Sequence, residues 1–376
     1  MRARDLGIII GMLEPGANNA ITDVAGVRVG FTTLIEGEGP LVVGRGPVRT
    51  GVTVIIPHEG NVWREPLFAG CHSLNGNGEV TGLEWVRESG LLMSPVALTN
   101  THSVGVVRDA LVSDAATHHG SNDLFWALPV VGETYDGLLN DINGLHVRPE
   151  HVSAALAAAR SGPVAEGNVG SGTGMICHDF KGGIGTASRV VPAASGGYTV
   201  GVLVQANHGR RERLSINGVP VGQAIPVSEV PAPEWPGPAP RQGAGSIIVI
   251  VATDAPLIPT QCARLAQRAG LGVARCGGFG EHYSGDIFLA FSTANRGLPA
   301  SEYSDASPLT VPLTMLSNTY ITDLFDAVVE ATEEAIVNTL LAARTMTGRD
   351  GVTAYALPVE RLLDVMHRYG RLAAQG

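Results

Sequence analysis

The stretch PGPAPRQGAGSIIVIVATDAPL, residues 236–257, joins two kinds of sequence that seldom meet so abruptly. Its first part belongs to a proline-rich segment, residues 228–245, whose composition indicates an extended linker. At Ser246 the composition changes, and an unbroken apolar run over residues 247–252 predicts a buried strand. The junction raises a question of chemistry: why should a linker end at a serine that begins a core strand?

One answer is that the chain is cut between Gly245 and Ser246. Ser246 would then carry a free α-amine, whose ordinary pKa of about 7.7–8.0 suits a general base near neutral pH. Hydroxyl and base would belong to one residue, which is the arrangement of N-terminal nucleophile enzymes. Gly245 leaves its carbonyl open to attack, and a rigid strand holds the serine in place. The alternative is an ordinary serine at a strand start.

The composition indicates one large globular domain that spans residues 1–376. Hydrophobic residues make up 44% of the chain and charged residues 16%, which is enough to build a sizeable core. The 49 glycines and 23 prolines favour many short elements of mixed α and β structure. The net charge of -10 and the lack of Lys/Arg clusters argue against a nucleic-acid partner. The four cysteines are scattered, which suits a reducing compartment rather than a disulfide framework.

Hydrophobic patterns predict the main strands and helices. Apolar runs predict strands over residues 51–57, 197–207, 246–253 and 286–293. Apolar residues at three- and four-residue spacing predict helices over residues 149–160, 260–269 and 323–345. The N-terminal run LGIII is too short for a signal peptide, and we interpret it as a strand. We expect no membrane span and a cytoplasmic location.

Three other chemistries have weaker support. The glycine-rich segment 166–189 lacks the Gly-Lys-Ser/Thr ending of a phosphate loop, so we expect tight turns there. The adjacent pairs at residues 71–72 and 177–178, each a cysteine followed by a histidine, lack zinc-ligand spacing. No G-x-S-x-G elbow occurs. We therefore predict neither a metal nor another cofactor.

Motifs spread along nearly the whole chain carry a resemblance to a known family. They include NGNGEVTGLEWVRESG, LTNTHSVGVVRDA, LPVVGETYDGLLNDING, EGNVGSGTGM, GVLVQANHG, GSIIVIVATDAPL and SGDIFLAFSTAN. The chain resembles the DmpA-type L-aminopeptidase/D-amidase/D-esterase family, which includes the β-peptidyl aminopeptidases. The resemblance implies a four-layer αββα sandwich and self-cleavage into an α chain, residues 1–245, and a β chain, residues 246–376. It also implies a homotetramer of the processed units.

The resemblance also implies roles for individual residues. Ser246 matches the nucleophile, and Gly245 and Ser246 flank the self-cleavage site. Ser284 and Asp286 match a pair beside the nucleophile, where a carboxylate favours the protonated α-amine. Asn207 matches an asparagine that stabilises the oxyanion.

Two further positions line the implied site. Tyr135 matches a tyrosine at the catalytic centre, and Glu133 matches the acid that receives the amine of the substrate in β-peptidyl relatives. At residue 208 the family usually has an aromatic Tyr or Phe, whereas this chain has His208.

The leading prediction is a self-processing serine aminopeptidase or amidase that acts on small peptides, amides or esters. An acyltransferase of the ornithine acetyltransferase type shares the implied fold but uses threonine as nucleophile. An amide hydrolase acting on pantetheine or nylon oligomers and an unprocessed scaffold protein also stay open.

Overall fold

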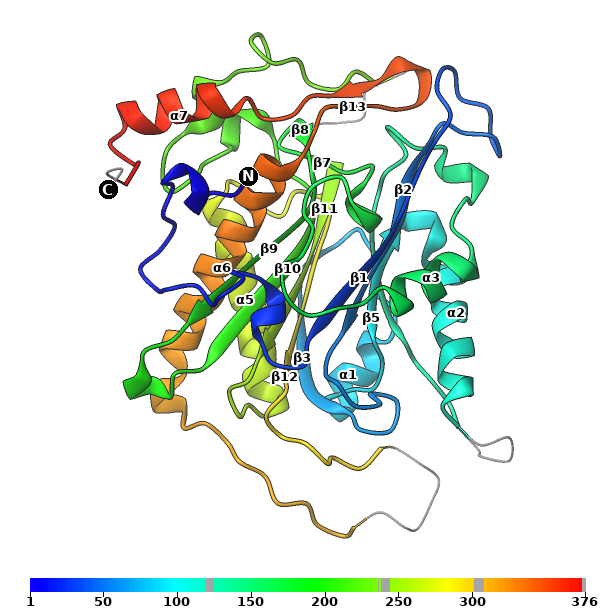
Figure 1. Cartoon of the computed structure of the whole chain (residues 1–376), viewed down its shortest axis with the longest axis vertical. Coiled ribbons are helices and arrows are strands. Elements are labelled where there is room, and N and C mark those ends of the chain that lie inside the picture. The colour runs from blue at the N-terminus through cyan, green and yellow to red at the C-terminus, as the bar shows by residue number, and fades with distance from the viewer. Residues whose placement is uncertain (120–124, 236, 238–243, 301–307, 374–376) are drawn as a thin grey trace.

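The computed structural model describes residues 1–119, 125–235, 237, 244–300 and 308–373. Two β-sheets lie face to face, and helices cover the outer face of each sheet (Figure 1). The αββα sandwich expected from the sequence is therefore confirmed.

The larger sheet contains the apolar run that follows the linker. Its strand order is β4-β3-β12-β11-β10-β9, and β11 pairs in parallel with β12 and antiparallel with β10. The strands are β3 (Leu67–Gly76), β4 (Leu91–Leu92), β9 (Gly183–Val190), β10 (Thr199–Asn207), β11 (Ala244–Thr253) and β12 (Tyr283–Ser292). We call it the six-stranded sheet.

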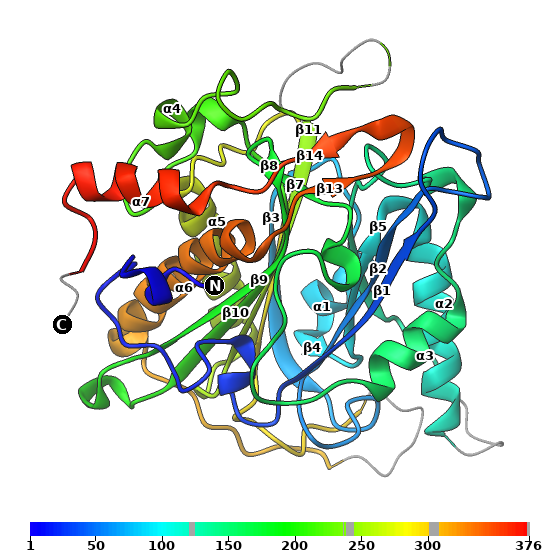
Figure 2. The ribbon, with the colours of Figure 1, turned by 45° about the horizontal axis from the view of Figure 1, so that its top comes forward.

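The smaller sheet has the order β1-β2-β5-β6 and comes from the N-terminal third of the chain. Its strands are β1 (Arg28–Glu36), β2 (Val48–Ile56), β5 (Val96–Asn100) and β6 (Val130–Thr134). Two short hairpins lie at one end of the sandwich: β7 (Ile176–Cys177) with β8 (Phe180–Lys181), and β13 (Met346–Thr347) with β14 (Thr353–Ala354). Figure 2 shows both hairpins near the start of β11.

Helices complete the outer layers. Those of the described residues are α1 (Leu83–Ser89), α2 (Val104–Thr117), α3 (Pro149–Ala157), α4 (Val221–Ala224), α5 (Pro259–Arg275), α6 (Ile321–Ala342) and α7 (Val359–Arg368). Helices α5 and α6 pack on the six-stranded sheet, and α2 and α3 pack on the smaller one. None of the helices in the described part of the chain is long and apolar enough to cross a bilayer.

The side chains of β11 alternate between two cores, as the two-residue period of a strand requires. Ile247, Val249 and Val251 join the core under α5 and α6. Ile248 and Ile250 join the core between the two sheets. Both faces of β11 are thus buried, which explains why its sequence is apolar without alternation.

The predicted strands and helices are found in the structure, with one exception. The run LGIII, residues 6–10, is not a strand: it follows a short 3-10 turn, Arg4–Leu6, and continues as irregular chain. Ile8 and Ile10 are buried in the core that contains α6, and the Ile10 carbonyl accepts a hydrogen bond from Arg189. The apolar pattern there reflects packing on the helical layer and not strand pairing.

Seven residues of the linker, 236 and 238–243, lie outside the described residues. Where the chain is described again, β11 begins at Ala244, two residues before Ser246. The division into chains of residues 1–245 and 246–376 stays a prediction. If the chain were cut there, β11 would begin the second chain and would still lie between β10 of the first chain and β12 of the second.

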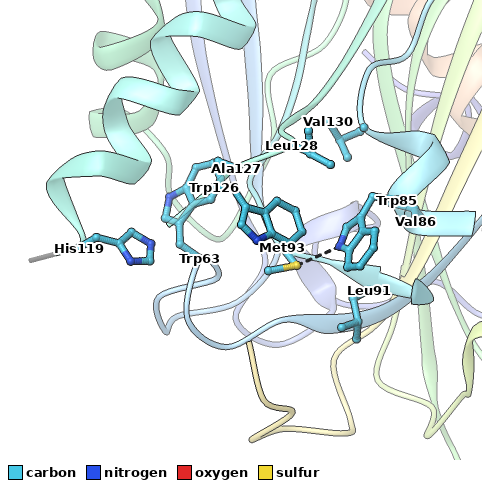
Figure 3. A pocket seen from close by; sticks show the side chains of 11 residues that line it. Trp63, Trp85, Val86, Leu91, Met93, His119, Trp126, Ala127, Leu128 and Val130 are labelled. Atoms are coloured by element: carbon cyan, nitrogen blue, oxygen red, sulfur yellow. Dashed lines mark hydrogen bonds between the residues drawn. The ribbon is translucent and has the colours of Figure 1, made fainter. Parts of the chain in front are cut away.

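Three of the four tryptophans gather in one cluster beside α1 and β4. The indole rings of Trp85 and Trp126 meet edge to face at 5.1 Å, and the Trp85 Nε1–H donates to Met93 Sδ at 3.2 Å (Figure 3). Trp63 completes the cluster. The hollow between these side chains has a volume of about 10 Å³, so it holds no more than one water molecule and no substrate.

Candidate functional site

The candidate nucleophile lies near the start of β11, between two neighbouring strands. Ser246 pairs with Asn207 on β10 and with Gly285 on β12. Strand alternation places the Ser246 side chain on the same face as Ile248, which points toward the smaller sheet. This end of β11 lies at the top of the molecule in Figure 2.

A pocket of about 980 Å³ opens at this point, large enough for a small peptide. Five of the residues predicted for the site line it: Glu133, Tyr135, Asn207, Gly245 and Ser246. Its remaining walls come from the loop after β3, from the segment after β10 and from the described part of the linker. The main contributors from these segments are Asn77, Glu79, Arg210, Glu212, Pro233 and Trp235.

The Ser246 hydroxyl lies beside the peptide bond that precedes it. Its Oγ–H donates to the Gly245 carbonyl oxygen at 2.6 Å, and its Oγ accepts a hydrogen bond from the Gly285 N–H at 3.2 Å. Only 5% of Ser246 is exposed. A Cβ on Gly245 would lie 2.6 Å from the Asn207 carbonyl oxygen, so only glycine fits at this position.

The Asn207 side chain is held in one orientation. Its Oδ1 accepts a hydrogen bond from the Ile176 N–H at 2.8 Å, and its Nδ2 donates to the Tyr135 carbonyl oxygen at 3.1 Å. Because an amide nitrogen carries two hydrogens, one remains for a ligand in the pocket. The arrangement suits a donor to an oxyanion.

Ser284 and Asp286 lie on the β12 side of the nucleophile, and neither lines the pocket. The Ser284 Oγ–H donates to Asp286 Oδ1 at 2.6 Å. Burial raises the pKa of Asp286 to about 6, while hydrogen bonds from Ser284 and from the main chain of Ile247 oppose that rise. The carboxylate therefore lies next to the main chain that immediately follows Ser246.

Glu133 is a buried carboxylate on the opposite wall, at the end of β6, and only 3% of it is exposed. Its Oε1 accepts a hydrogen bond from the Glu79 N–H at 2.8 Å, and its Oε2 accepts one from the Thr101 hydroxyl. Burial raises the pKa of Glu133, and these two hydrogen bonds oppose the rise. Such a carboxylate favours a cationic ligand in the pocket.

Tyr135 follows directly after β6, and the residue is 42% exposed and lines the pocket. Burial of the hydroxyl, followed by the charge of Asp136, raises the pKa of Tyr135. His208 also lines the pocket but is buried, and desolvation holds its pKa well below the usual range. The ring of His208 is therefore neutral at physiological pH.

The structure adds supporting residues to which sequence reasoning gave no role. The Gly285 N–H contacts the nucleophile, Thr101 anchors Glu133, and Asn75 Oδ1 accepts the Asp286 N–H at 2.8 Å. Asn75 lies in the motif NGNGEV, which the sequence shows, but the sequence does not show that Asn75 contacts Asp286. These contacts depend on strand register, which the sequence does not specify.

Comparison with known proteins agrees with this architecture. The pattern of peptidase family S58 matches residues 19–354. The chain is 51% identical to the beta-peptidyl aminopeptidase BapA of Sphingosinicella microcystinivorans, with 99% of this chain and 93% of the relative covered. It is 46% identical to the BapA of Sphingosinicella xenopeptidilytica, with 97% and 90% covered.

Solved structures show the same fold. A beta-aminopeptidase from a Burkholderia species superposes with a TM-score of 0.91 at 55% identity, covering 98% of this chain and 99% of the other. The L-aminopeptidase D-Ala-esterase/amidase of Ochrobactrum anthropi superposes with a TM-score of 0.88 at 46% identity, with 99% of each chain covered. The latter is described as a prototype of the serine aminopeptidases and a variant of the Ntn hydrolase fold. The chain therefore belongs to peptidase family S58 and is a hydrolase of the aminopeptidase/amidase type.

Proposed function

We propose that this protein cuts its own chain between Gly245 and Ser246, and then releases N-terminal aminoacyl groups from small peptides, amides or esters through an acyl-enzyme on Ser246. One observation carries the proposal. The Ser246 hydroxyl lies 2.6 Å from the oxygen of the Gly245 carbonyl, inside a large pocket that also contains Asn207 and Glu133.

Maturation begins with attack of Ser246 Oγ on the Gly245 carbonyl carbon. The C–N bond breaks, the glycyl group moves to the hydroxyl oxygen as an ester, and the nitrogen becomes the α-amine of Ser246. Water then hydrolyses the ester and leaves a carboxylate on Gly245. The missing side chain of Gly245 supports this step, because a larger residue would collide with the main chain of β10.

Turnover uses the α-amine made by that cut. The amine accepts the proton of Ser246 Oγ as the oxygen attacks the substrate carbonyl, and later returns it to the leaving group. The free hydrogen of Asn207 Nδ2 donates to the developing oxyanion. Asp286, beside the Ile247 main chain, favours the protonated form of the amine between these steps.

Glu133 gives the enzyme its preference for a free N-terminus. A substrate ammonium would pair with this buried carboxylate and offset the cost of its desolvation. The relatives named beta-peptidyl aminopeptidases agree with an amine-directed site. Because the anchor recognises the amine, we propose that both α- and β-aminoacyl groups are accepted.

The experiment compares a free and an N-acetylated aminoacyl p-nitroanilide. An acetylated substrate leaves Glu133 without a cation, at a cost of roughly 1–3 kcal/mol, so kcat/KM should fall about 10- to 100-fold. Glu133→Gln should remove most of this discrimination, whereas Glu212→Gln, an exposed carboxylate at the same pocket, should preserve it. Equal rates for both substrates on the native enzyme would rule out the proposed specificity.

We also propose that the processed units assemble as a homotetramer in the cytoplasm. Closed symmetry is the usual form of soluble oligomers. The four free cysteines support a reducing compartment. Gel filtration with light scattering tests the assembly, and a dimer or monomer would reject it.

A further inference from the structure

A cluster of three side chains with metal-binding chemistry lies behind the pocket wall. Cys177 ends β7, His178 follows it, and His208 follows β10. One donor atom from each residue lies within 4.8 Å of the other two, and all three residues are buried. Among the described residues, the Cys71–His72 pair does not join this group.

The spacing of the donors is close to that of a coordinated cation. Cys177 Sγ lies 3.9 Å from His208 Nδ1, and the rings of His178 and His208 meet edge to face at 5.2 Å. Sulfur and nitrogen ligands on a tetrahedral Zn²⁺ are about 3.5 Å apart. Small side-chain movements would therefore complete a three-ligand site.

His178 is already oriented as metal-binding histidines are. Its Nδ1–H donates to the Arg210 carbonyl oxygen at 3.0 Å, which fixes the tautomer and leaves Nε2 as an unprotonated acceptor. Within the described residues this Nε2 is buried and has no hydrogen-bond partner. An unpaired buried acceptor is costly, and a cation is a partner that it can bind.

Protonation affects the ligands differently. The hydrogen bond from His178 Nδ1–H already leaves the Nε2 lone pair of this residue available. Burial raises the pKa of Cys177 to about 12, which opposes the thiolate, so a cation must displace the thiol proton to solvent when it binds. Burial lowers the pKa of His178, and the positive charge of Arg211, which lowers it further, opposes a cation. Loss of the thiol proton reduces the charge added by Zn²⁺ from two to one.

The cluster is linked to the candidate oxyanion donor by two segments of main chain. Cys177 follows Ile176, whose N–H holds Asn207 Oδ1, and His208 follows Asn207 directly. The two segments also meet where the His178 N–H donates to the His208 carbonyl oxygen at 2.7 Å. Because His208 lines the pocket, a cation could enter from there.

We propose that Cys177, His178 and His208 bind a thiophilic cation, with Zn²⁺ as the representative case, and that its binding lowers turnover. Coordination would draw together the two segments that orient Asn207. The proposed binding of the cation depends only on the Cys177, His178 and His208 cluster, whereas its proposed effect on turnover rests on the proposed function.

The experiment measures binding to the processed protein without using activity. Co²⁺ should produce a thiolate charge-transfer absorption at one equivalent, and Zn²⁺ should displace it. Cys177→Ala should abolish the absorption, and His208→Phe should weaken Zn²⁺ binding at least about tenfold. Cys71→Ala, which removes a partly exposed thiol that also precedes a histidine, should change neither result.

A second arm measures turnover of an aminoacyl p-nitroanilide. Zn²⁺ should lower kcat of the native enzyme, a chelator should restore it, and His208→Phe should be much less sensitive. Thermal denaturation confirms that each variant is folded. If the native protein bound no Co²⁺ or Zn²⁺, or if Cys177→Ala and His208→Phe bound them as the native protein does, the proposed site would be wrong. If Zn²⁺ bound and kcat stayed unchanged, the inhibitory role would be wrong. A native protein that binds Co²⁺ but lacks all turnover would contradict the proposed function and leave the site intact.

Discussion

At the scale of single residues, the Asn207 amide is fixed by the main chain on both sides. The Ile176 N–H holds its oxygen, and the Tyr135 carbonyl holds one hydrogen of its nitrogen. We predict that Asn207→Ala lowers kcat about 10²- to 10³-fold, because an oxyanion donor acts in the transition state. KM should change much less. Asn168→Ala, which removes a half-buried asparagine bonded to the Arg344 main chain, is the control and should keep the native kcat. An unchanged kcat in Asn207→Ala would remove this residue from the site.

Asp286 gives a prediction about pH. Its pKa of about 6 means that the carboxyl is ionised above pH 6 and protonated below it. If the ionised form holds the Ser246 amine, as proposed, kcat/KM should fall as pH decreases through this range. A nearby ammonium would lower the pKa of Asp286, so this limb should lie at or below about pH 6, beneath the separate limb of the α-amine, which must lose its proton to act as the base. Asp286→Asn should lower activity and abolish only the lower limb. A pH profile of kcat/KM that keeps the lower limb in the variant would assign it to another group.

At the scale of elements, β8 contains Lys181, the only lysine of the chain, and this residue is fully buried. Its Nζ donates to the carbonyl oxygens of Met175 and Gly182 at 2.8 Å and of Gly172 at 3.3 Å. Met175 precedes Ile176, which holds Asn207. We therefore infer that Lys181 is a positioning residue that stabilises the turn behind the candidate oxyanion donor, Asn207.

We predict that Lys181→Met lowers kcat with a smaller change in KM, because three carbonyl groups lose their partner and the turn shifts. Each buried group left unpaired costs roughly 1–3 kcal/mol, so the melting temperature should fall as well. Steady-state kinetics below that melting temperature separate the two effects. A folded variant with native kcat would limit Lys181 to a structural role.

The strands and helices with strong periodicity could be predicted from the sequence. The apolar run after Ser246 predicts β11 because a strand buried on both faces needs no polar residues. The same reasoning is wrong for LGIII, because Ile8 and Ile10 pack on the helical layer, and the Ile10 carbonyl bonds to the side chain of Arg189 rather than to a neighbouring strand. An apolar pattern shows that a segment is buried, but it does not show which element the segment packs against.

Only part of the candidate site could be predicted from the sequence. Ser246 is marked by the junction with the linker, and family resemblance suggests Asn207 and Glu133. The contacts from Gly285 and Thr101 depend on register and on the packing of two sheets, which local sequence does not encode. The Cys177 cluster also needs the fold, because His208 lies 31 residues away in the chain.

At the scale of the whole molecule, a cut at Gly245 would leave one folded unit. β11 would remain hydrogen-bonded to β10 on one side and to β12 on the other. Helix α6 of the second chain is also tied to the first through Arg189, which is fully buried and bonds Glu330 at 3.0 Å and Glu334 at 2.7 Å. Breaking a buried ion pair typically costs about 3–5 kcal/mol, so these contacts resist separation. The two chains should co-elute under native conditions.

We propose that Ser246 cuts the chain before itself and becomes an N-terminal nucleophile, and intact-mass spectrometry after methylation of primary amines tests both steps in one measurement. Residues 246–376 contain no lysine, so a label on that fragment would mark only the α-amine of Ser246. We predict two fragments from the native protein, with one labelled amine on the fragment that begins at Ser246, and a single intact chain of 39.0 kDa from Ser246→Ala. A native protein that stays uncut, or a Ser246→Ala variant cut at the same bond, would contradict it.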